Sequence, residues 1–489
     1  MELTKKSTQK PTSGKKKASG NKMGTAPVKR LLLSMGIPMI ISMALQALYN
    51  IVDSYFVSCM PNTEDVLNMG DCGANALTLA FPIQMLMVAI GVGTGVGVNA
   101  ILSRSLGEGD REKASRIAGN SIFLGIGTFI VFLIFGVFGV KAYIGTQTSD
   151  AVIFDMASEY LTICCVYSFG ISMYMTYEKL LQATGRTVLS TIAQISGALT
   201  NIVLDPIMIF GLAGVPQMGI AGAAYATIIG QFVSFLLDAV FHYLFNKKDF
   251  DTHMKYMLPQ GKMIAEIYRV GIPAIIMQAL MSFMTYGVNI IFNLVSASAV
   301  TAYGLYYKIQ QFVFFSAFGM NNAMIPVIAF NYGKKDQQRV NDGIRYGMLY
   351  TLVIMAAGLI VLQTFAYGIS DIFAVSDQTK ELTVAAIRII TVGYLFVGAN
   401  IAYQGIFQAL DHGVASLVLS FLRLIIVALP VAFVFTMLPH SQYTIWWAFP
   451  IAEFAALIYA VLYMRKIRSS KIDPLSEPIS AGCPEPETT

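Results

Sequence analysis

Three polar side chains inside apolar segments are the residues of this chain whose types and spacing best suit ion chemistry. Asp53 lies in the outer part of one apolar segment, and Asp205 lies at a similar depth in another, counted from the same side. Asn201 precedes Asp205 by four residues, which places its amide on the same face of a helix. We therefore expect two carboxylates and an amide to face one another inside a helical bundle.

Such a group can bind a proton or a cation. Two carboxylates in a poorly solvated site repel each other, which favours a proton on one of them. The same oxygens can instead hold a hard cation, which predicts a sodium site at Asp53, Asn201 and Asp205. The structural alternative is that Asp205-Pro206 ends a helix and that Asp53 extends toward water.

Other charges in apolar segments have simpler explanations. Glu178 precedes Lys179 and is either an interfacial charge or a carboxylate that meets a cationic substrate from the inside. Asp238 and His242 are four residues apart, which favours a pair at the membrane interface. An ion pair is also expected between Arg423 and Glu453. Two further cations, Lys308 and Arg388, have no evident partner.

The elements that position these residues are membrane-spanning helices. Apolar residues make up 55% of the 489 residues, charged residues only 12%, and the mean hydropathy is +0.62, which is typical of an integral membrane protein. About twelve apolar runs are long enough to cross roughly 30 Å of hydrocarbon. They lie at 31–58, 74–102, 117–143, 157–181, 188–212, 218–245, 267–294, 300–331, 342–366, 382–408, 413–437 and 441–465.

The chain repeats itself, which predicts two similar halves. The ten residues from Gly36 return from Gly271 with seven identities, a shift of 235 residues. Gly107 and Asp110 recur as Gly333 and Asp336, a shift of 226. Six spans in each half give parallel repeats with substrate between them. The second half lacks the two carboxylates and the amide, because the positions matching Asp53, Asn201 and Asp205 are Val288, Val427 and Val431.

Loop charges predict the orientation and the domain limits. All but five of the 33 Lys and Arg residues fall on the side that holds both termini, and cytoplasmic loops collect such residues. Lys141 and Lys380 fall on the other side, and the remaining three are within spans. The expected parts are a disordered basic cytoplasmic tail (1–30), a six-helix N-terminal lobe (31–245), a cytoplasmic linker (246–263), a six-helix C-terminal lobe (264–466) and a disordered tail (467–489).

Several function classes are disfavoured. The five cysteines have no metal-binding spacing, although Cys59 and Cys72 flank one outer loop and could form a disulfide. No metalloprotease motif, nucleophile elbow or catalytic cluster is present, so no enzyme is expected. A channel would need a ring of selectivity residues, which neither half offers. The positive net charge reflects topology, so no nucleic acid partner is expected.

Five motifs in order resemble the multidrug and toxic compound extrusion (MATE) family, over about residues 28–466. They are Leu48-Tyr49-Asn50-Ile51-Val52-Asp53, Gly107-Glu108-Gly109-Asp110, Leu181-Gln182-Ala183-Thr184-Gly185, Asn201-Ile202-Val203-Leu204-Asp205-Pro206 and Gly219-Ile220-Ala221-Gly222-Ala223-Ala224. The resemblance implies an all-α, V-shaped pair of six-helix lobes in the cell membrane. It also implies export of cationic, amphipathic drugs by antiport with protons or sodium, without another cofactor.

The resemblance also implies roles for particular residues. It places the ion-coupling site at Asp53, Asn201 and Asp205 and substrate handling at Glu178. Substrate contacts are expected from a wider set of residues, namely Glu178, Gln46, Tyr49, Asn50 and Tyr177. The transporter is expected to act as a monomer among membrane lipids. The segment 267–294 carries no acid, unlike one branch of the family. The alternative is a flippase for a lipid-linked precursor, which would need a strongly cationic central cavity.

Overall fold

The structure is a computed structural model that describes residues 21–62, 68–371 and 376–476. Within these ranges, the side chains of Ala47 and of residues 49–51 are not described. All regular secondary structure in the described part of the chain is helical, which confirms the expected all-α fold. Helices satisfy every backbone polar group within one segment, as crossing a lipid bilayer requires.

The N-terminal lobe (N-lobe) consists of six spans, one of which is bent. The bend of 47° separates α6 from α7. The spans are α2 (Val28–Ser58), α3 (Met69–Glu108), α4 (Arg111–Phe138), α6 (Ala151–Val166) with α7 (Phe169–Ala183), α8 (Thr187–Phe210) and α9 (Gly219–Phe245). Short helices flank them: α1 (Lys22–Thr25), α5 (Val140–Gly145), η1 (Asn246–Lys248) and α10 (Met254–Met257).

The C-terminal lobe (C-lobe) repeats this plan, with a 55° bend between α14 and α15. Its spans are α11 (Gly261–Asn293), α12 (Ala297–Gly333), α13 (Gln337–Asp371), α14 (Asp377–Thr391) with α15 (Tyr394–Ala409), α16 (Gly413–Phe421) with η2 (Leu422–Ile426) and α17 (Ala428–Thr436), and α19 (Ala448–Ile467). Short helices are α18 (Ser441–Thr444), η3 (Ile445–Trp447), η4 (Arg468–Ile472) and η5 (Asp473–Ser476). Ten helices of the described residues could cross a membrane, or twelve spans if each bent pair counts as one.

The repeated motif after α3 and α12 builds the same turn twice. Gly109 is left-handed with φ 78°, and Lys335 takes the matching position with φ 59°. The next residue in each copy is an aspartate that accepts a hydrogen bond from a backbone N–H three residues on, at 2.9 Å for Asp110 and 3.2 Å for Asp336. These side chains cap α4 and α13, because a carboxylate satisfies a free donor of the first helical turn.

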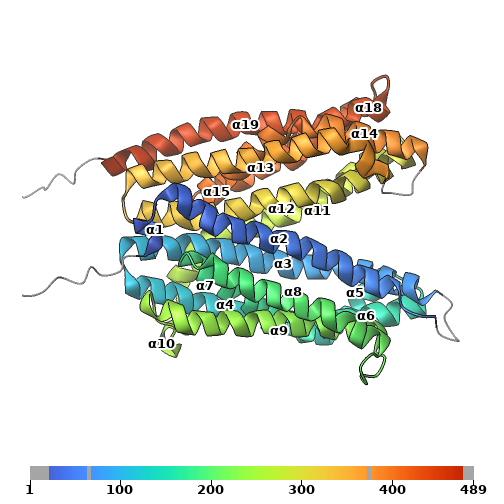
Figure 1. The fold of residues 1–489 in the computed structure, drawn as a ribbon, viewed down its shortest axis with the longest axis horizontal. Helices are drawn as coiled ribbons and strands as arrows, with labels where there is room; N and C mark the ends of the chain where they lie inside the picture. The colour runs from blue at the N-terminus through green and yellow to red at the C-terminus, as the bar shows by residue number, and fades with distance from the viewer. Residues whose placement is uncertain (1–20, 63–67, 372–375, 477–489) are drawn as a thin grey trace, which may run out of the picture.

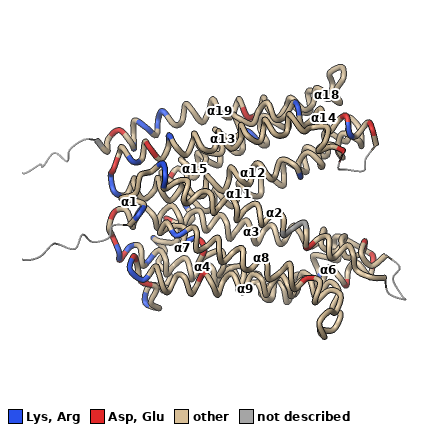
Figure 2. Tube along the Cα trace, viewed as in Figure 1, with Lys and Arg blue, Asp and Glu red and all other residues tan. Residues whose placement is uncertain are grey.

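The two lobes meet at one end of the molecule and diverge toward the other (Figure 1). The end where they meet carries both described chain ends and most Lys and Arg residues, and we call it the basic end (Figure 2). The other end is the far end. The lobes pack through α2 on α12 and α3 on α11. Gly36 lies against Met320 and, at the matching positions, Gly271 lies against Thr94, so the interface is itself a repeat.

Part of the expected N-terminal tail is folded. Met23 is fully buried, and Arg339 Nη2 donates to the carbonyls of Met23 and Ala26 at 2.7 and 2.8 Å. Lys334 Nζ donates to the carbonyl of Gly24 at 3.1 Å. Residues 21–26 therefore form a strap that joins α2 to the basic end of the C-lobe. The expected disordered tail 1–30 is wrong for residues 21–30, while residues 1–20 lie outside the described residues.

The expected C-terminal tail is also folded over its first part. Ile472 is fully buried, and Gln337 Nε2 donates to its carbonyl at 3.2 Å. The packing of η4 and η5 explains the difference, because Ile472 lies in the hydrophobic core and Leu475 packs against it. The expected disorder of 467–489 is therefore wrong up to Ser476, and residues 477–489 lie outside the described residues.

Candidate ion and substrate sites

Helices α2, α8 and α9 bring the predicted ion-site residues to the far half of the N-lobe. Asp205 is fully buried, Asn201 is 2% exposed and Asp53 is 8% exposed. The amide of Asn201 donates to Asp205 Oδ1 and to Thr227 Oγ1, both at 3.2 Å. Asp53 interacts electrostatically with Asp205. The structure thus places the three residues together, while their role in ion coupling stays a prediction.

The site has more oxygen atoms than donors. Oδ1 of Asp53, Oδ1 of Asn201 and Oδ2 of Asp205 are buried and have no hydrogen-bond partner among the described residues. Pro206 lies inside α8 and has no N–H, so the carbonyl of Ile202 loses its usual helical donor. Unpartnered buried oxygens are costly. The chemistry of these oxygens allows either a proton or a small hard cation to bind and satisfy them.

Thr227 is a member of this site that sequence reasoning missed. Thr227 lies on α9, and its hydroxyl oxygen accepts a hydrogen bond from the Asn201 amide. An uncharged threonine is not costly in an apolar helix, so nothing in its own segment indicates that it belongs to a site. Its position on the face of α9 that packs against α8 is visible only in the folded lobe.

The matching region of the C-lobe is closed by an ion pair. Glu453 occupies the position that matches Thr227 under the 226-residue shift, and Arg423 matches Gly197. Arg423 Nε donates to Glu453 Oε1 at 2.9 Å, and the amide of Asn400 donates to Glu453 Oε2 at 2.8 Å. The predicted ion pair is confirmed. The C-lobe therefore supplies its own cation where the N-lobe has open oxygens.

Glu178 is engaged by its own helix. Its Oε2 lies 3.5 Å from Lys179 Nζ, and its Oε1 accepts from Gln182 Nε2 at 2.7 Å. Lys179 Nζ also donates to Gln182 Oε1 at 2.9 Å. The Lys179 side chain is 7% exposed and that of Glu178 is 14% exposed. Glu178, Lys179 and Gln182 thus form a triad around an internal ion pair within the lobe, and substrate contact by Glu178 stays a prediction.

The other predicted substrate residues fall at different places. Gln46 on α2 accepts from Gln194 Nε2 at 3.0 Å, between the Asp53 site and the Glu178 triad along the lobe. Tyr177 packs its ring against α9 and is partly buried in the core of the lobe. The side chains of Tyr49 and Asn50 lie outside the described residues. Substrate contact by any of them stays a prediction.

The expected interfacial pair of Asp238 and His242 is wrong. Asp238 is fully buried and has no hydrogen-bond partner in the described part of the chain. His242 instead contacts Thr252 Oγ1 and the Asn246 amide, at 3.2 and 3.1 Å. The helical spacing was right for proximity, because both residues lie on the face of α9 that packs against α7, but the two side chains are not paired with each other.

The remaining charges in spans have separate surroundings. Arg388 stacks over the ring of Tyr367 at 5.1 Å, an attraction of roughly 0.5–2 kcal/mol. Lys308 on α12 is exposed. Cys59 and Cys72 are both free thiols.

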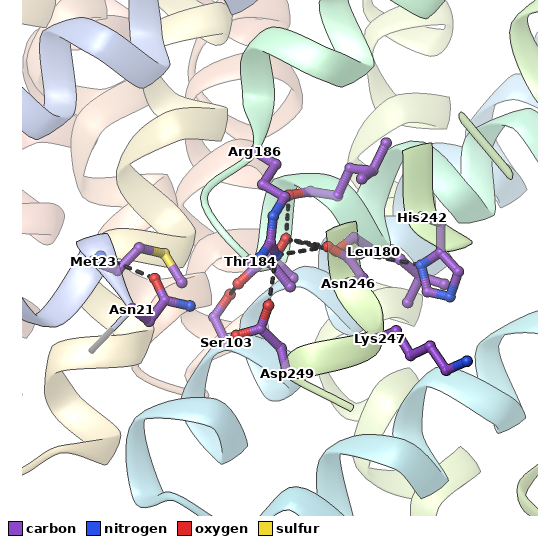
Figure 3. Close-up of polar contacts among 12 residues, drawn as sticks. Asn21, Met23, Ser103, Leu180, Thr184, Arg186, His242, Asn246, Lys247 and Asp249 are labelled. Atoms are coloured by element: carbon purple, nitrogen blue, oxygen red, sulfur yellow. Dashed lines mark hydrogen bonds and ion pairs between the residues drawn. The ribbon is translucent and has the colours of Figure 1, made fainter. Parts of the chain in front are cut away.

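A polar junction closes the basic end of the N-lobe, where α7, α8 and α9 end or begin (Figure 3). Asn246 Oδ1 accepts from Thr184 Oγ1 at 3.0 Å and from Arg186 Nη1 at 2.7 Å. Arg186 also pairs with Asp249 at 2.6 Å. The strap residue Met23 lies against Gly185 in this region. The junction therefore holds the ends of α7, α8 and α9 together at the basic end.

The MatE family model matches residues 38–207 and 273–434, one stretch in each lobe. The chain belongs to the MatE family. The expected family resemblance is confirmed. Multidrug export protein MepA of Staphylococcus aureus (strain bovine RF122 / ET3-1) is similar to this MatE chain, with 24% identity over 446 residues, 91% of this chain and 95% of the relative. MepA of Staphylococcus haemolyticus (strain JCSC1435) is also 24% identical, over 90% of this chain and 94% of its own length.

Solved structures show the same fold. An outward-facing multidrug resistance MATE family transporter of the MOP superfamily has a TM-score of 0.86 at 23% identity, covering 94% of this chain and 100% of that one. A mutant of the Vibrio cholerae MATE transporter VcmN has a TM-score of 0.82 at 20% identity, covering 91% of this chain and 98% of that one. The MatE chain is therefore a multi-pass membrane protein of two six-helix lobes in a V.

Proposed function

We propose that this MatE protein is a secondary active multidrug exporter that exchanges cationic, amphipathic molecules for protons or sodium ions. The observation that carries the proposal is the buried group of Asp53, Asn201 and Asp205, with one open oxygen on each residue. The second repeat has valines at all three positions. A group kept in one lobe only serves a task other than holding the repeated fold together.

The coupling ion acts by stabilising one arrangement of the N-lobe. A proton or sodium ion enters from the far end and satisfies the open oxygens, which changes how α2 packs on α8. An ion can drive a cycle only if it binds two states with different affinity. On release of the ion, the exporter takes a cationic substrate between the lobes, with Glu178 as its acidic contact. No further cofactor takes part.

The arrangement of the lobes supports an outward-facing state. The close approaches between the lobes, including Gly36 with Met320 and Gly107 with Phe330, lie in the basic half. The concentration of Lys and Arg there favours a cytoplasmic location for that end (Figure 2). Both termini are then cytoplasmic, and the space between the diverging lobes opens outward. The protein acts as a monomer, because each chain contains both lobes.

The test is ethidium transport in liposomes that contain the purified protein, under an imposed pH gradient or an imposed sodium gradient. We expect one gradient to drive transport, and the Asp205→Asn variant to lose the response to that gradient while still folding and binding ethidium. Full gradient-driven efflux in Asp205→Asn would refute the coupling site. No transport by the wild type under either gradient would instead favour a flippase for lipid-linked substrates.

A further inference from the structure

Asp238 is a fully enclosed carboxyl group in the basic half of the N-lobe. It is 0% exposed, and neither of its oxygens has a hydrogen-bond partner among the described residues. An ionised carboxylate left without partners in such a place costs several kcal/mol. The group must therefore be neutralised, and a proton is the ligand that needs no coordinating neighbours.

The contact between α7 and α9 determines what Asp238 faces. The ring of Tyr177 lies 5.7 Å from that of Phe235 and 5.2 Å from that of His242. Phe235 and His242 lie about one turn to either side of Asp238 on α9. Because Tyr177 bridges them, Asp238 lies opposite the face of α7 that carries Glu178.

The charges around Asp238 balance only if it carries a proton. Glu178 and Lys179 both interact electrostatically with Asp238, and they form an ion pair with each other. The pair has no net charge, so an ionised Asp238 would leave the cluster negative. Three other titratable groups lie near this contact: Tyr174 on α7, His242 on α9 and Arg186 in the turn before α8. Arg186 is already paired with Asp249.

We propose that Asp238 is a second proton-binding site of the N-lobe, which holds its proton while Lys179 occupies Glu178 and releases it when an organic cation takes that place. The proposal rests on the proposed export function. The exchange conserves charge: before it, the cluster contains one carboxylate, one ammonium and one neutral acid. Afterwards it contains two carboxylates, the ammonium and the bound cation. The proton leaves Asp238 for water, and Lys179 then faces the new carboxylate.

Polar side chains lie between this cluster and the basic end. The buried face of α9 carries His242 and Asn246 beyond Asp238, and His242 contacts Thr252 in the linker. These groups end at the junction with Arg186 and Asp249 (Figure 3). These side chains therefore place ring nitrogens and hydroxyl groups between Asp238 and the solvent at the basic end.

The aliphatic part of the Lys179 side chain also borders a small cavity between α3, α4 and α7. Its volume of about 20 Å³ is enough for one water molecule. Thr94 Oγ1 and Ser172 Oγ line it and are buried without partners among the described residues. The cavity therefore places two unpartnered hydroxyl groups beside the Lys179 side chain.

The test measures protons released when ethidium binds to the purified protein in weakly buffered detergent solution with a pH-indicating dye. We expect release from the wild type and from Asp205→Asn, and a smaller release from Asp238→Asn, whose amide has the size of the neutral acid and whose remaining release comes from the Asp53–Asp205 group. Release by Asp238→Asn equal to that of the wild type would overturn the proposal.

Infrared spectroscopy separates this site from the export function. One component of the protonated carboxyl band at neutral pH should be lost in Asp238→Asn and shifted in Asp238→Glu, which also keeps an acid if the amide variant does not fold, while any component from the Asp53–Asp205 group should remain. An unchanged band in Asp238→Asn would refute the site even where export is intact. A wild type that neither binds nor transports ethidium, yet shows the Asp238 band, would refute the exchange with the cation and the export function, while the proton site would stand.

Discussion

Gly107 and Gly333 face each other's helices at the crossing of α3 and α12. A side-chain carbon at Gly107 would meet the carbonyl of Phe330, and one at Gly333 would meet the carbonyl of Arg104. Arg104 and Phe330 are themselves matching positions of the two repeats. The pseudo-symmetry axis therefore passes through this crossing, and the absence of side chains on two glycines permits the lobes to close at the basic end.

Replacing Gly333 with valine should open the basic end. Overpacking a close contact costs about 1–3 kcal/mol, which corresponds to a roughly five-fold to hundred-fold shift between closed and open states. We expect longer distances between spin labels at Glu108 and Lys335, measured by pulsed electron resonance. Gly304→Ala is the matched control, since a side-chain carbon there meets nothing within 4 Å. Unchanged label distances in Gly333→Val would contradict this role for the crossing.

Removing the Thr227 hydroxyl should weaken ion binding. Thr227→Val keeps the shape of the side chain but deprives the Asn201 amide of its second acceptor. Loss of one such hydrogen bond in a buried site costs about 1–3 kcal/mol. We expect the coupling-ion concentration at half-maximal transport to rise roughly five-fold to a hundred-fold, whereas Thr227→Ser should remain near the wild type. Equal ion dependence in the valine variant and the wild type would remove Thr227 from the site.

Arg339 should control the strap at the basic end. Arg339→Ala leaves the carbonyls of Met23 and Ala26 without their charged donor. A hydrogen bond from a charged group contributes about 1.5–3 kcal/mol, so amide hydrogen exchange at Gly24 and Ala26 should accelerate by roughly ten-fold to a hundred-fold. Exchange in α9, which does not contact Arg339, provides the internal reference. Protection at the strap equal to the wild type would show that Met23 packing alone holds it.

Removing one partner of the C-lobe ion pair should destabilise the protein more than removing both. Arg423→Met leaves Glu453 buried and unpaired, which costs about 3–5 kcal/mol. The double variant with Glu453→Leu should recover most of that loss, because well-packed apolar residues can replace a buried pair. The measurement is the thermal unfolding temperature in detergent. A double variant as unstable as the single one would indicate that Asn400, which donates to Glu453, needs the carboxylate.

The fold could be predicted largely from the sequence because hydropathy and repetition act over whole segments. Each of the twelve expected runs corresponds to a span, with the two bent pairs at matching positions of the repeats. The meeting of Asp53 with Asp205 followed from their similar depth, and the ion pair of Arg423 with Glu453 followed from the cost of isolated charges in a membrane.

What tertiary structure decided depends on helix rotation and on packing between lobes. Thr227 joins the ion site only because α9 turns that face toward α8, and Asp238 is buried because the same rotation aims it at α7. Lys179 could be placed on a helix from sequence, but its contact with Glu178 depends on rotamers. The sequence by itself determined the spans, the repeat and the residues too costly to be in lipid without a partner. Which of these residues meet, and at which end the lobes close, depends on side-chain contacts between segments far apart in the chain, and no local pattern encodes those contacts.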